Sequence, residues 1–147
     1  MLVAAGAGAP MAAAGLQTFP RGEVTIVTAD GGRHDFTVEE ARTPAQRSQG
    51  LMYRPRLAPE AGMLFIYEKD WPVAMWMKNT RIPLDMLFIA RDGRIAYVAE
   101  RAVPYSLESI SAGQPVAGVL EINGGSAARL GIAAGDRVIH PAFAASP

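Results

Sequence analysis

Short runs of alternating or β-branched residues dominate the chain beyond its first twenty residues. Residues 23–28 and 34–39 form two such runs, and Asp30-Gly31-Gly32 lies between them. Glycine next to aspartate is typical of the tight turns that join antiparallel strands. We therefore expect a β-hairpin at the start of the domain.

A helix start follows at Thr43-Pro44-Ala45-Gln46. Thr43 can cap the first turn, and the fixed φ of Pro44 suits the first helical position. Gln46 has the right spacing to complete a capping box with Thr43. Gly50 is placed to end the helix, so the sequence predicts one short helix here.

Six further runs predict short strands. They cover residues 63–67, 73–78, 85–90, 94–100, 116–122 and 137–140. Asp92-Gly93 predicts a tight turn, and Ser126 is expected to cap a single helical turn that Gly131 ends. No helical segment is long enough to supply the crossovers of a parallel sheet. We expect a mainly β fold, either a small β-sandwich or a partly open barrel, with one or two short helical turns.

Residues 75–80, Met-Trp-Met-Lys-Asn-Thr, are the most informative segment. In an extended chain Met75 and Met77 share one face, while Trp76 and Lys78 share the other. One interpretation is structural: the methionines fill gaps in the core, and Trp76 packs under the Lys78 side chain. The last two residues then begin a turn.

Two functional interpretations use the same alternation. Trp76 offers a flat apolar platform, Lys78 a cation, and Asn79 both a donor and an acceptor, which suits a sugar or a small anion in a shallow cleft. Alternatively, the thioethers of Met75 and Met77 could bind a cuprous ion, because soft sulfur ligands suit soft metals.

Several other polar residues extend the candidate site. Arg47 and Arg54 could form an anion-binding edge beside Lys78, and Asp85 can accept hydrogen bonds from nearby backbone amides. The candidate ligand-binding residues are Arg47, Arg54, Trp76, Lys78, Asn79, Thr80, Asp85 and Glu121.

An enzyme is the alternative class, using Lys78, Asp85 and Glu121, with Asp136 as a further carboxylate. None of these has a partner at a recognisable spacing. Glu121 alternates with apolar neighbours, so we expect it on a solvated face. His34 and His140 lie far from the central segment, so we assign no catalytic, metal or cofactor residues.

Net charge, cysteine content and length limit the classes of partner, the chemistry and the number of domains. The 147 residues have a net charge of +0, which gives no general attraction to nucleic acid. The absence of cysteine excludes disulfides and thiolate chemistry. The length fits one domain, which we place at residues 21–142, with a leader at 1–20 and a tail at 143–147.

The leader is uncharged and rich in Ala and Gly up to Gln17. Ala12-Ala13-Ala14 followed by Gly15 is similar to the cleavage site of a secretory signal, although the basic start of such a signal is missing. The segment is too short and too rich in glycine to act as a stable membrane anchor. We expect a periplasmic or secreted protein.

Four blocks of residues resemble one protein family. They are Gly50-Leu51-Met52-Tyr53-Arg54, Gly62-Met63-Leu64-Phe65, residues 75–80, and Ile82-Pro83-Leu84-Asp85. In this order and spacing they are similar to the signature of the domain of unknown function 192 family, over about residues 23–140. The resemblance implies a compact β-rich domain, commonly exported by bacteria, with no established reaction. Gln46 departs from it, because an acidic residue usually precedes Arg47.

The segment 125–138 also resembles the helix-turn-strand device of PDZ peptide-binding modules. A PDZ module needs a glycine-rich carboxylate-binding loop a few strands upstream, and Gly62-Met63-Leu64-Phe65 lies too far away for that role. Peptide-tail binding is therefore the weaker alternative.

The sequence favours non-catalytic binding through the face of Trp76, Lys78 and Asn79. The expected partner is a small polar or carbohydrate-like ligand or a protein of the cell envelope. We expect a monomer or a weak dimer without a cofactor.

Overall fold

The computed structural model describes residues 15–143. Most of the expected leader and almost all of the expected tail therefore lie outside the described residues. None of the helices within residues 15–143 combines the length and the apolar character needed to cross a bilayer.

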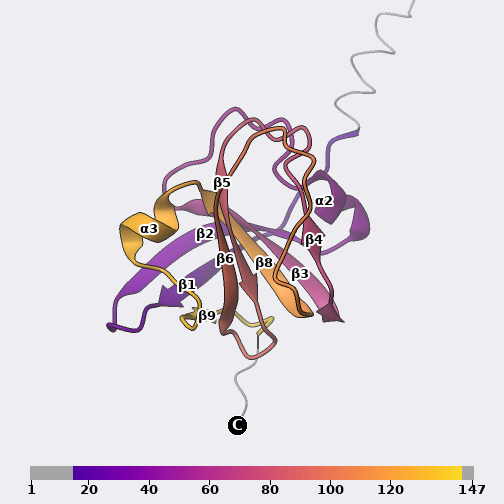
Figure 1. Ribbon diagram of the computed structural model, residues 1–147. Helices are drawn as coiled ribbons and strands as arrows, with labels where there is room; N and C mark the ends of the chain where they lie inside the picture. Colours follow the sequence, from indigo (N-terminus) through magenta and orange to yellow (C-terminus); the bar gives the residue numbers. More distant parts are fainter. Residues whose placement is uncertain (1–14, 144–147) are drawn as a thin grey trace, which may run out of the picture.

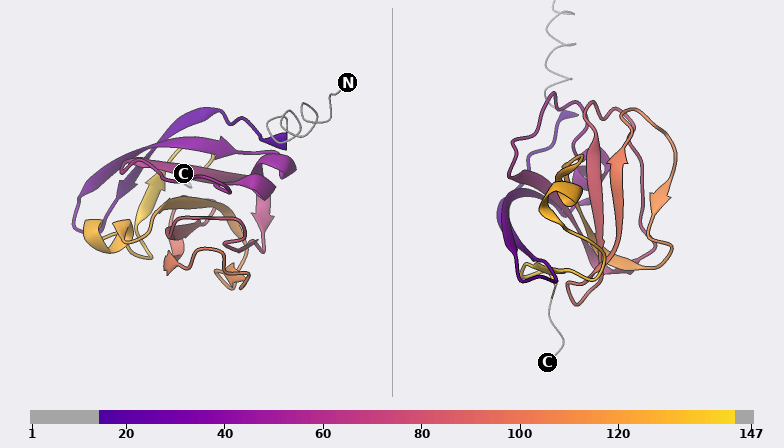
Figure 2. Two further views of the ribbon diagram at one scale, coloured as in Figure 1. Left: turned by 90° about the horizontal axis from the view of Figure 1, so that it is seen from above. Right: turned by 60° about the vertical axis from the view of Figure 1, so that its left-hand side comes forward.

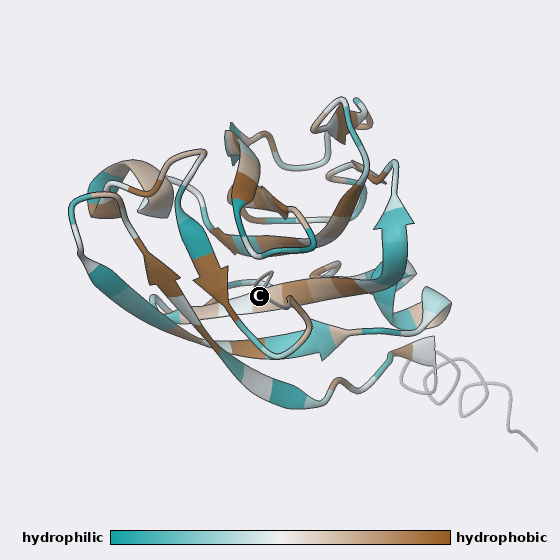
Figure 3. Ribbon diagram, turned by 90° about the horizontal axis from the view of Figure 1, so that it is seen from below, coloured by the Kyte–Doolittle hydropathy of each residue, from teal (hydrophilic) through white to brown (hydrophobic). Residues whose placement is uncertain are grey.

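The predicted hairpin is confirmed. Strand β1 (Arg21–Val27) pairs antiparallel with β2 (Arg33–Ala41), with Val24 opposite Phe36. Val24 and Phe36 are buried, and the strands alternate buried with more exposed residues. The hairpin thus covers the core with one face and meets water with the other, and Figure 3 shows hydrophilic and hydrophobic residues following one another along its strands.

Seven strands in the described part of the chain form one sheet in the order β6-β5-β8-β3-β2-β1-β9, and β4 and β7 form a second, two-stranded sheet. The remaining bounds are β3 (Ala61–Trp71), β4 (Ala74–Met75), β5 (Leu84–Ile89), β6 (Ile95–Ala102), β7 (Ile110–Ser111), β8 (Val116–Asn123) and β9 (Arg137–Ile139). The strand predicted at residues 73–78 is thus only two residues long.

The large sheet curls on itself, as Figures 1 and 2 show. Its two ends come together where Arg94 bridges to Arg137, and the Ile95 N–H donates to the carbonyl of Asp136 at 2.8 Å. The mainly β fold is confirmed, in the form of a partly open barrel. Strand twist of a constant hand produces this curvature in a seven-stranded sheet.

One neighbouring pair contradicts the expectation of a sheet without parallel strands. β2 and β3 pair parallel, with Thr37 opposite Ala61. Their connection, residues 42–60, contains helix α2 (Pro44–Gln49) and a loop. The loop supplies the length that the short helix lacks, so a crossover of this size needs no long helix.

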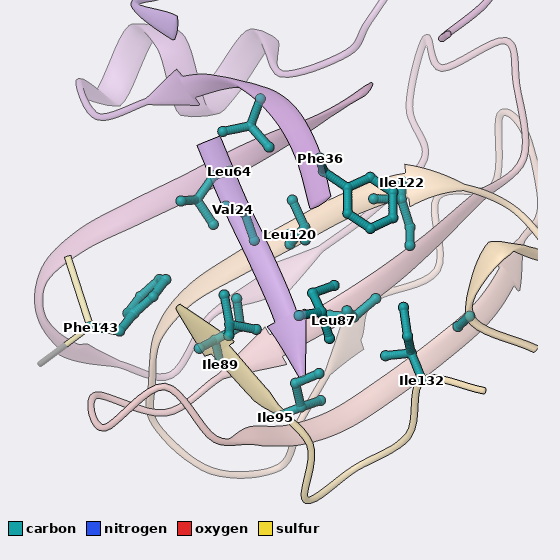
Figure 4. Packing of buried hydrophobic residues seen from close by; sticks show 14 of the residues in the cluster. Val24, Phe36, Leu64, Leu87, Ile89, Ile95, Leu120, Ile122, Ile132 and Phe143 are labelled. Atoms are coloured by element: carbon teal, nitrogen blue, oxygen red, sulfur yellow. The ribbon is translucent and has the colours of Figure 1, made fainter. Parts of the chain in front are cut away.

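Buried residues form two clusters on opposite faces of the sheet. The first lies inside the curl and includes Val24, Phe36, Leu87, Leu120 and Phe143, as Figure 4 shows. The second lies on the outer face of the central strands and comprises Ala41, Leu51, Met63, Phe65, Val73, Met77, Leu84, Met86, Phe88, Ala99, Ala102, Val116 and Val119. Strands β5 and β8 are consequently buried on both faces.

Helix α2 begins and ends as predicted. The Gln46 N–H donates to the Thr43 side chain at 3.1 Å, and the Gln46 side chain accepts from the Thr43 N–H at 3.0 Å. Gly50 follows with φ 50°, and a Cβ there would lie 2.9 Å from the Phe65 ring. Glycine thus lets the end of α2 sit directly on β3.

Candidate ligand-binding cleft

An open cleft of about 1220 Å³ lies beside α2 and β4, which are on the same side of the molecule in Figure 1. Six of the eight residues predicted for the site line it: Arg47, Trp76, Lys78, Asn79, Thr80 and Glu121. They come from α2, from the segment after β4, and from the central strand β8. The fold therefore brings together residues that are up to 74 positions apart, from 47 to 121.

The predicted turn after Lys78 is present. The Thr80 N–H donates to the Met77 carbonyl at 3.1 Å, and Asn79 has φ 55°. Tyr53, with φ 70°, donates its N–H to the Asn79 carbonyl at 2.9 Å, and the Asn79 Nδ2 donates to the Tyr53 hydroxyl at 3.3 Å. Two residues in left-handed backbone conformations thus hold each other at the rim, and such strained positions cluster at functional sites.

Alternation of side chains persists beyond the two-residue strand β4. Met77 is fully buried, whereas 47% of Trp76 is exposed and Lys78 is exposed. The Lys78 Nζ lies 5.1 Å from the centre of the Trp76 ring, a cation–π contact. The regular strand ends early because the Met77 N–H donates to the carbonyl of Ser106 in a loop.

The alternative of a cuprous ion bound by Met75 and Met77 needs both thioethers to be accessible. The burial of Met77 argues against such a site.

Arg47 stands at the α2 side of the cleft. Its Nη1 donates to the carbonyls of Arg42 and, at 3.2 Å, Ile66. The guanidinium lies 4.7 Å from the centre of the Tyr67 ring. One edge of the group is thus fixed by the backbone while the side chain still lines the cleft.

The prediction that Glu121 lies on a solvated face is wrong. Only 4% of it is exposed, because the face of β8 opposite Leu120 packs against the second core cluster and not against water. Burial raises the pKa of the Glu121 carboxyl to about 8. None of the described residues hydrogen-bonds to this carboxyl, and its remaining exposed part faces the cleft.

Tyr67 was not predicted for the site. It lines the cleft beside Arg47 and Glu121. Burial raises the pKa of its phenol, with the Arg47 guanidinium opposing the shift and Glu121 adding to it. Alternation could have identified it, since Tyr67 lies two residues after Phe65, which lines the same cleft.

Arg54, predicted beside Lys78, does not line the cleft. Its two terminal nitrogens donate to both carboxylate oxygens of Glu39 at 2.8 and 3.0 Å. A bidentate pair of this kind uses the geometry that Arg would offer to an anionic ligand. Arg54 therefore fastens the loop after α2 to strand β2.

Asp85 lies outside the cleft as well. It is fully buried and accepts the N–H groups of Arg101 and Ala127 at 2.8 Å each and of Gly125 at 3.0 Å. Asp85 thereby caps helix α3 (Ser126–Leu130), whose Ser126 makes no capping hydrogen bond. The prediction of Ser126 as the cap was wrong, because a carboxylate from a distant strand takes that role.

The remaining candidate polar residues have structural contacts away from the cleft. Asp136 accepts backbone N–H groups from Ala29 at 3.0 Å and Ala133 at 2.8 Å. His140 lies 2.7 Å from the Glu40 carboxylate, a buried pair that sequence spacing could not reveal. Residues 15–143 contain no group of three or more His, Cys, Asp or Glu side chains suited to hold a metal ion.

Comparison with known proteins places the chain in a family. Residues 25–140 match the model of the domain of unknown function 192 family, described as an uncharacterised ACR. A protein from Sinorhizobium meliloti 1021, described as a "putative transcription regulator", is 52% identical with a TM-score of 0.82, over 84% of this chain and 96% of that one.

A protein of unknown function from Novosphingobium aromaticivorans DSM 12444 is 45% identical with a TM-score of 0.79, over 82% of this chain and 85% of that one. None of the curated proteins matches the chain. The family match includes the segment 125–138, so the PDZ-like device is here a part of this fold. The chain belongs to the domain of unknown function 192 family.

Proposed function

We propose that this domain binds a small polar or carbohydrate-like ligand in the cleft without transforming it. The main support is the position of Trp76, a half-exposed aromatic ring with Lys78 above it at the edge of an open cleft. An aromatic face with polar groups around it is the arrangement that suits sugar rings. Three of the four family-like blocks, at residues 50–54, 62–65 and 75–80, contribute residues to this cleft.

Binding is favoured over catalysis by the contacts of the polar residues. The enzyme hypothesis uses Lys78, Asp85 and Glu121 as its candidate groups, but Asp85 is buried beneath α3, where it accepts three backbone N–H groups. Among the described cleft residues no hydroxyl or amine donates a hydrogen bond to a side chain that could act as its base.

A second candidate, DNA-linked regulation, comes from the description of the Sinorhizobium relative. We favour it less, because a net charge of +0 supplies no electrostatic attraction to a phosphate backbone. A salt-dependent mobility shift of DNA by the full chain at micromolar protein would reverse this preference.

We further propose that the protein is periplasmic or secreted, which the signal-like composition of residues 1–17 supports. Fractionation of bacteria that express the full chain tests this. Recovery of the protein in the cytoplasmic fraction alone would contradict it.

The ligand proposal is tested by a thermal-shift screen of neutral and charged oligosaccharides. A ligand that binds the folded state raises the apparent melting temperature. We expect at least one oligosaccharide to stabilise the wild type and the Trp71→Ala variant but not Trp76→Ala. Trp71 is the matched control, because 56% of it is exposed and it does not line the cleft.

Two results would contradict the proposal. One is the absence of any stabilisation across the screen. The other is an equal shift in Trp76→Ala and in the wild type, because that places the ligand elsewhere.

A further inference from the structure

The cleft has an excess of positive charge in a protein whose net charge is zero. Within residues 15–143, the charged or ionisable side chains that line it, tyrosines aside, are Arg47, Lys78 and Glu121. The ion pairs within residues 15–143 involve other cations, so neither Arg47 nor Lys78 is neutralised by a described carboxylate. Two uncompensated cations that line one cleft favour an anionic occupant.

The single carboxyl among the described residues of the cleft does not cancel these charges. Burial holds Glu121 in its neutral form at pH 7, and its neighbours in the β-ladder are apolar, Met63 on β3 and Met86 on β5. A protonated carboxyl donates one hydrogen bond and accepts others. Glu121, almost wholly buried and without a described partner, therefore offers the cleft a donor and not a negative charge.

The size and the walls of the cleft indicate more than one sugar ring. Its volume of about 1220 Å³ exceeds the roughly 300–1,000 Å³ of most small-molecule pockets. Trp76, Tyr53 and Tyr67 contribute aromatic side chains to the lining. An oligosaccharide of a few units can use such aromatic surfaces for successive rings.

We propose, on the basis of the function proposed above, that the ligand is an acidic oligosaccharide whose carboxylates are attracted by Arg47 and Lys78 and hydrogen-bonded by Glu121. Neutral and cationic oligosaccharides of the same length then bind more weakly. Neutral oligosaccharides lack the charge attraction, and cationic ones are repelled by both Arg47 and Lys78.

Ligand binding and protonation are coupled in this site. The charged and titratable side chains that line the cleft with Glu121 are Arg47 on α2, Tyr67 on β3, and Lys78 and Tyr53 at the rim. A ligand carboxylate favours the protonated form of Glu121, because ionisation would place two negative charges together. Affinity for an acidic ligand should thus fall as the pH rises above about 8, where Glu121 ionises.

Isothermal titration calorimetry of the full chain with three trisaccharides tests the proposal. The probes are tri-galacturonic acid, maltotriose and the glucosamine trimer, which are anionic, neutral and cationic. At pH 7 we expect tri-galacturonic acid to bind about tenfold more tightly than maltotriose, the ratio that two partly exposed charge contacts can supply.

Variants identify the groups responsible. Lys78→Gln should weaken the binding of tri-galacturonic acid about fivefold and weaken that of maltotriose less, so that the preference for the acid shrinks. Lys78→Arg and the exposed control Lys69→Gln should retain the preference. Glu121→Gln keeps a neutral hydrogen-bond donor of the same shape. The variant should therefore bind tri-galacturonic acid at pH 7, and its affinity should not decline between pH 7 and 9.5 as that of the wild type does.

The outcomes separate the two proposals. Equal binding of maltotriose and tri-galacturonic acid overturns the acidic ligand and leaves carbohydrate binding in place. If none of the three trisaccharides binds, the proposal of an acidic ligand is overturned. If the wider thermal-shift screen is also negative, the proposal of carbohydrate binding is overturned as well. A preference that survives Lys78→Gln unchanged, or a pH profile that is the same in Glu121→Gln, overturns the assigned roles of these residues.

Discussion

Glu121 illustrates how strongly the surroundings of one residue control its chemistry. Its carboxyl sits on a central strand with 4% exposure, and burial raises its pKa from 4.5 to about 8. The folded protein therefore keeps a proton that the unfolded chain releases above pH 4.5. The associated stability is fully present below pH 4.5, falls as the pH rises, and is lost once the pH passes about 8.

The first prediction concerns Glu121→Gln. Because the variant cannot ionise, it should lack this decline, which amounts to about 1.4 kcal/mol per pH unit in the wild type between the two pKa values. Urea unfolding at pH 5 and pH 8 measures the difference. Glu100→Gln, at an exposed position on β6, is the control and should follow the wild type. An unchanged slope in Glu121→Gln would show that this carboxyl is ionised in the folded state.

Sequence reasoning assigned Trp76, Met77 and Lys78 to their faces correctly but placed Glu121 in water. Alternation tells which residues share a face, and it identified the side opposite Leu120 and Ile122. It cannot tell whether a second layer covers that side. Here the second core cluster covers it, through residues such as Leu51 and Met77 that come from outside the large sheet.

At the scale of elements, the two described helices differ in where their caps come from. Helix α2 is capped by Thr43 and Gln46, which are its own neighbours, and this was predicted in detail. Helix α3 is capped by Asp85, about 40 residues earlier in the chain. Local pattern predicts the first kind of cap, but the second depends on how β5 is placed in the sheet.

The contrast gives a prediction for α3. Asp85→Asn keeps the shape but replaces a buried carboxylate that accepts three backbone N–H groups, so we expect a loss of about 2 kcal/mol in the free energy of unfolding. Ser126→Ala, at the residue without a capping bond, should cost less than Asp85→Asn. Chemical denaturation at pH 7 provides the comparison, and a larger effect of Ser126→Ala would contradict the assignment of Asp85 as the cap.

At the scale of the whole molecule, the curled sheet separates a closed core from an open cleft. The inner cluster is sealed by the hairpin of β1 and β2 and by β9, whereas the outer cluster borders the cleft through Leu51 and Phe65. The mainly β fold followed from short runs and turns, which left a β-sandwich and a partly open barrel as alternatives. Most of the residues predicted for the site do line the cleft, but the shape of the cleft could not be predicted, because its walls come from α2, β3, the segment after β4, and β8.

The most direct test of ligand binding through the Trp76 face is a ¹H–¹⁵N NMR titration of the full chain with tri-galacturonic acid. We predict progressive shifts of the Trp76 indole N–H and of the backbone amides of Lys78 and Asn79, while the Trp71 indole N–H stays in place. No shift at Trp76 with any carbohydrate that stabilises the protein, or equal shifts at both indoles, would contradict the account.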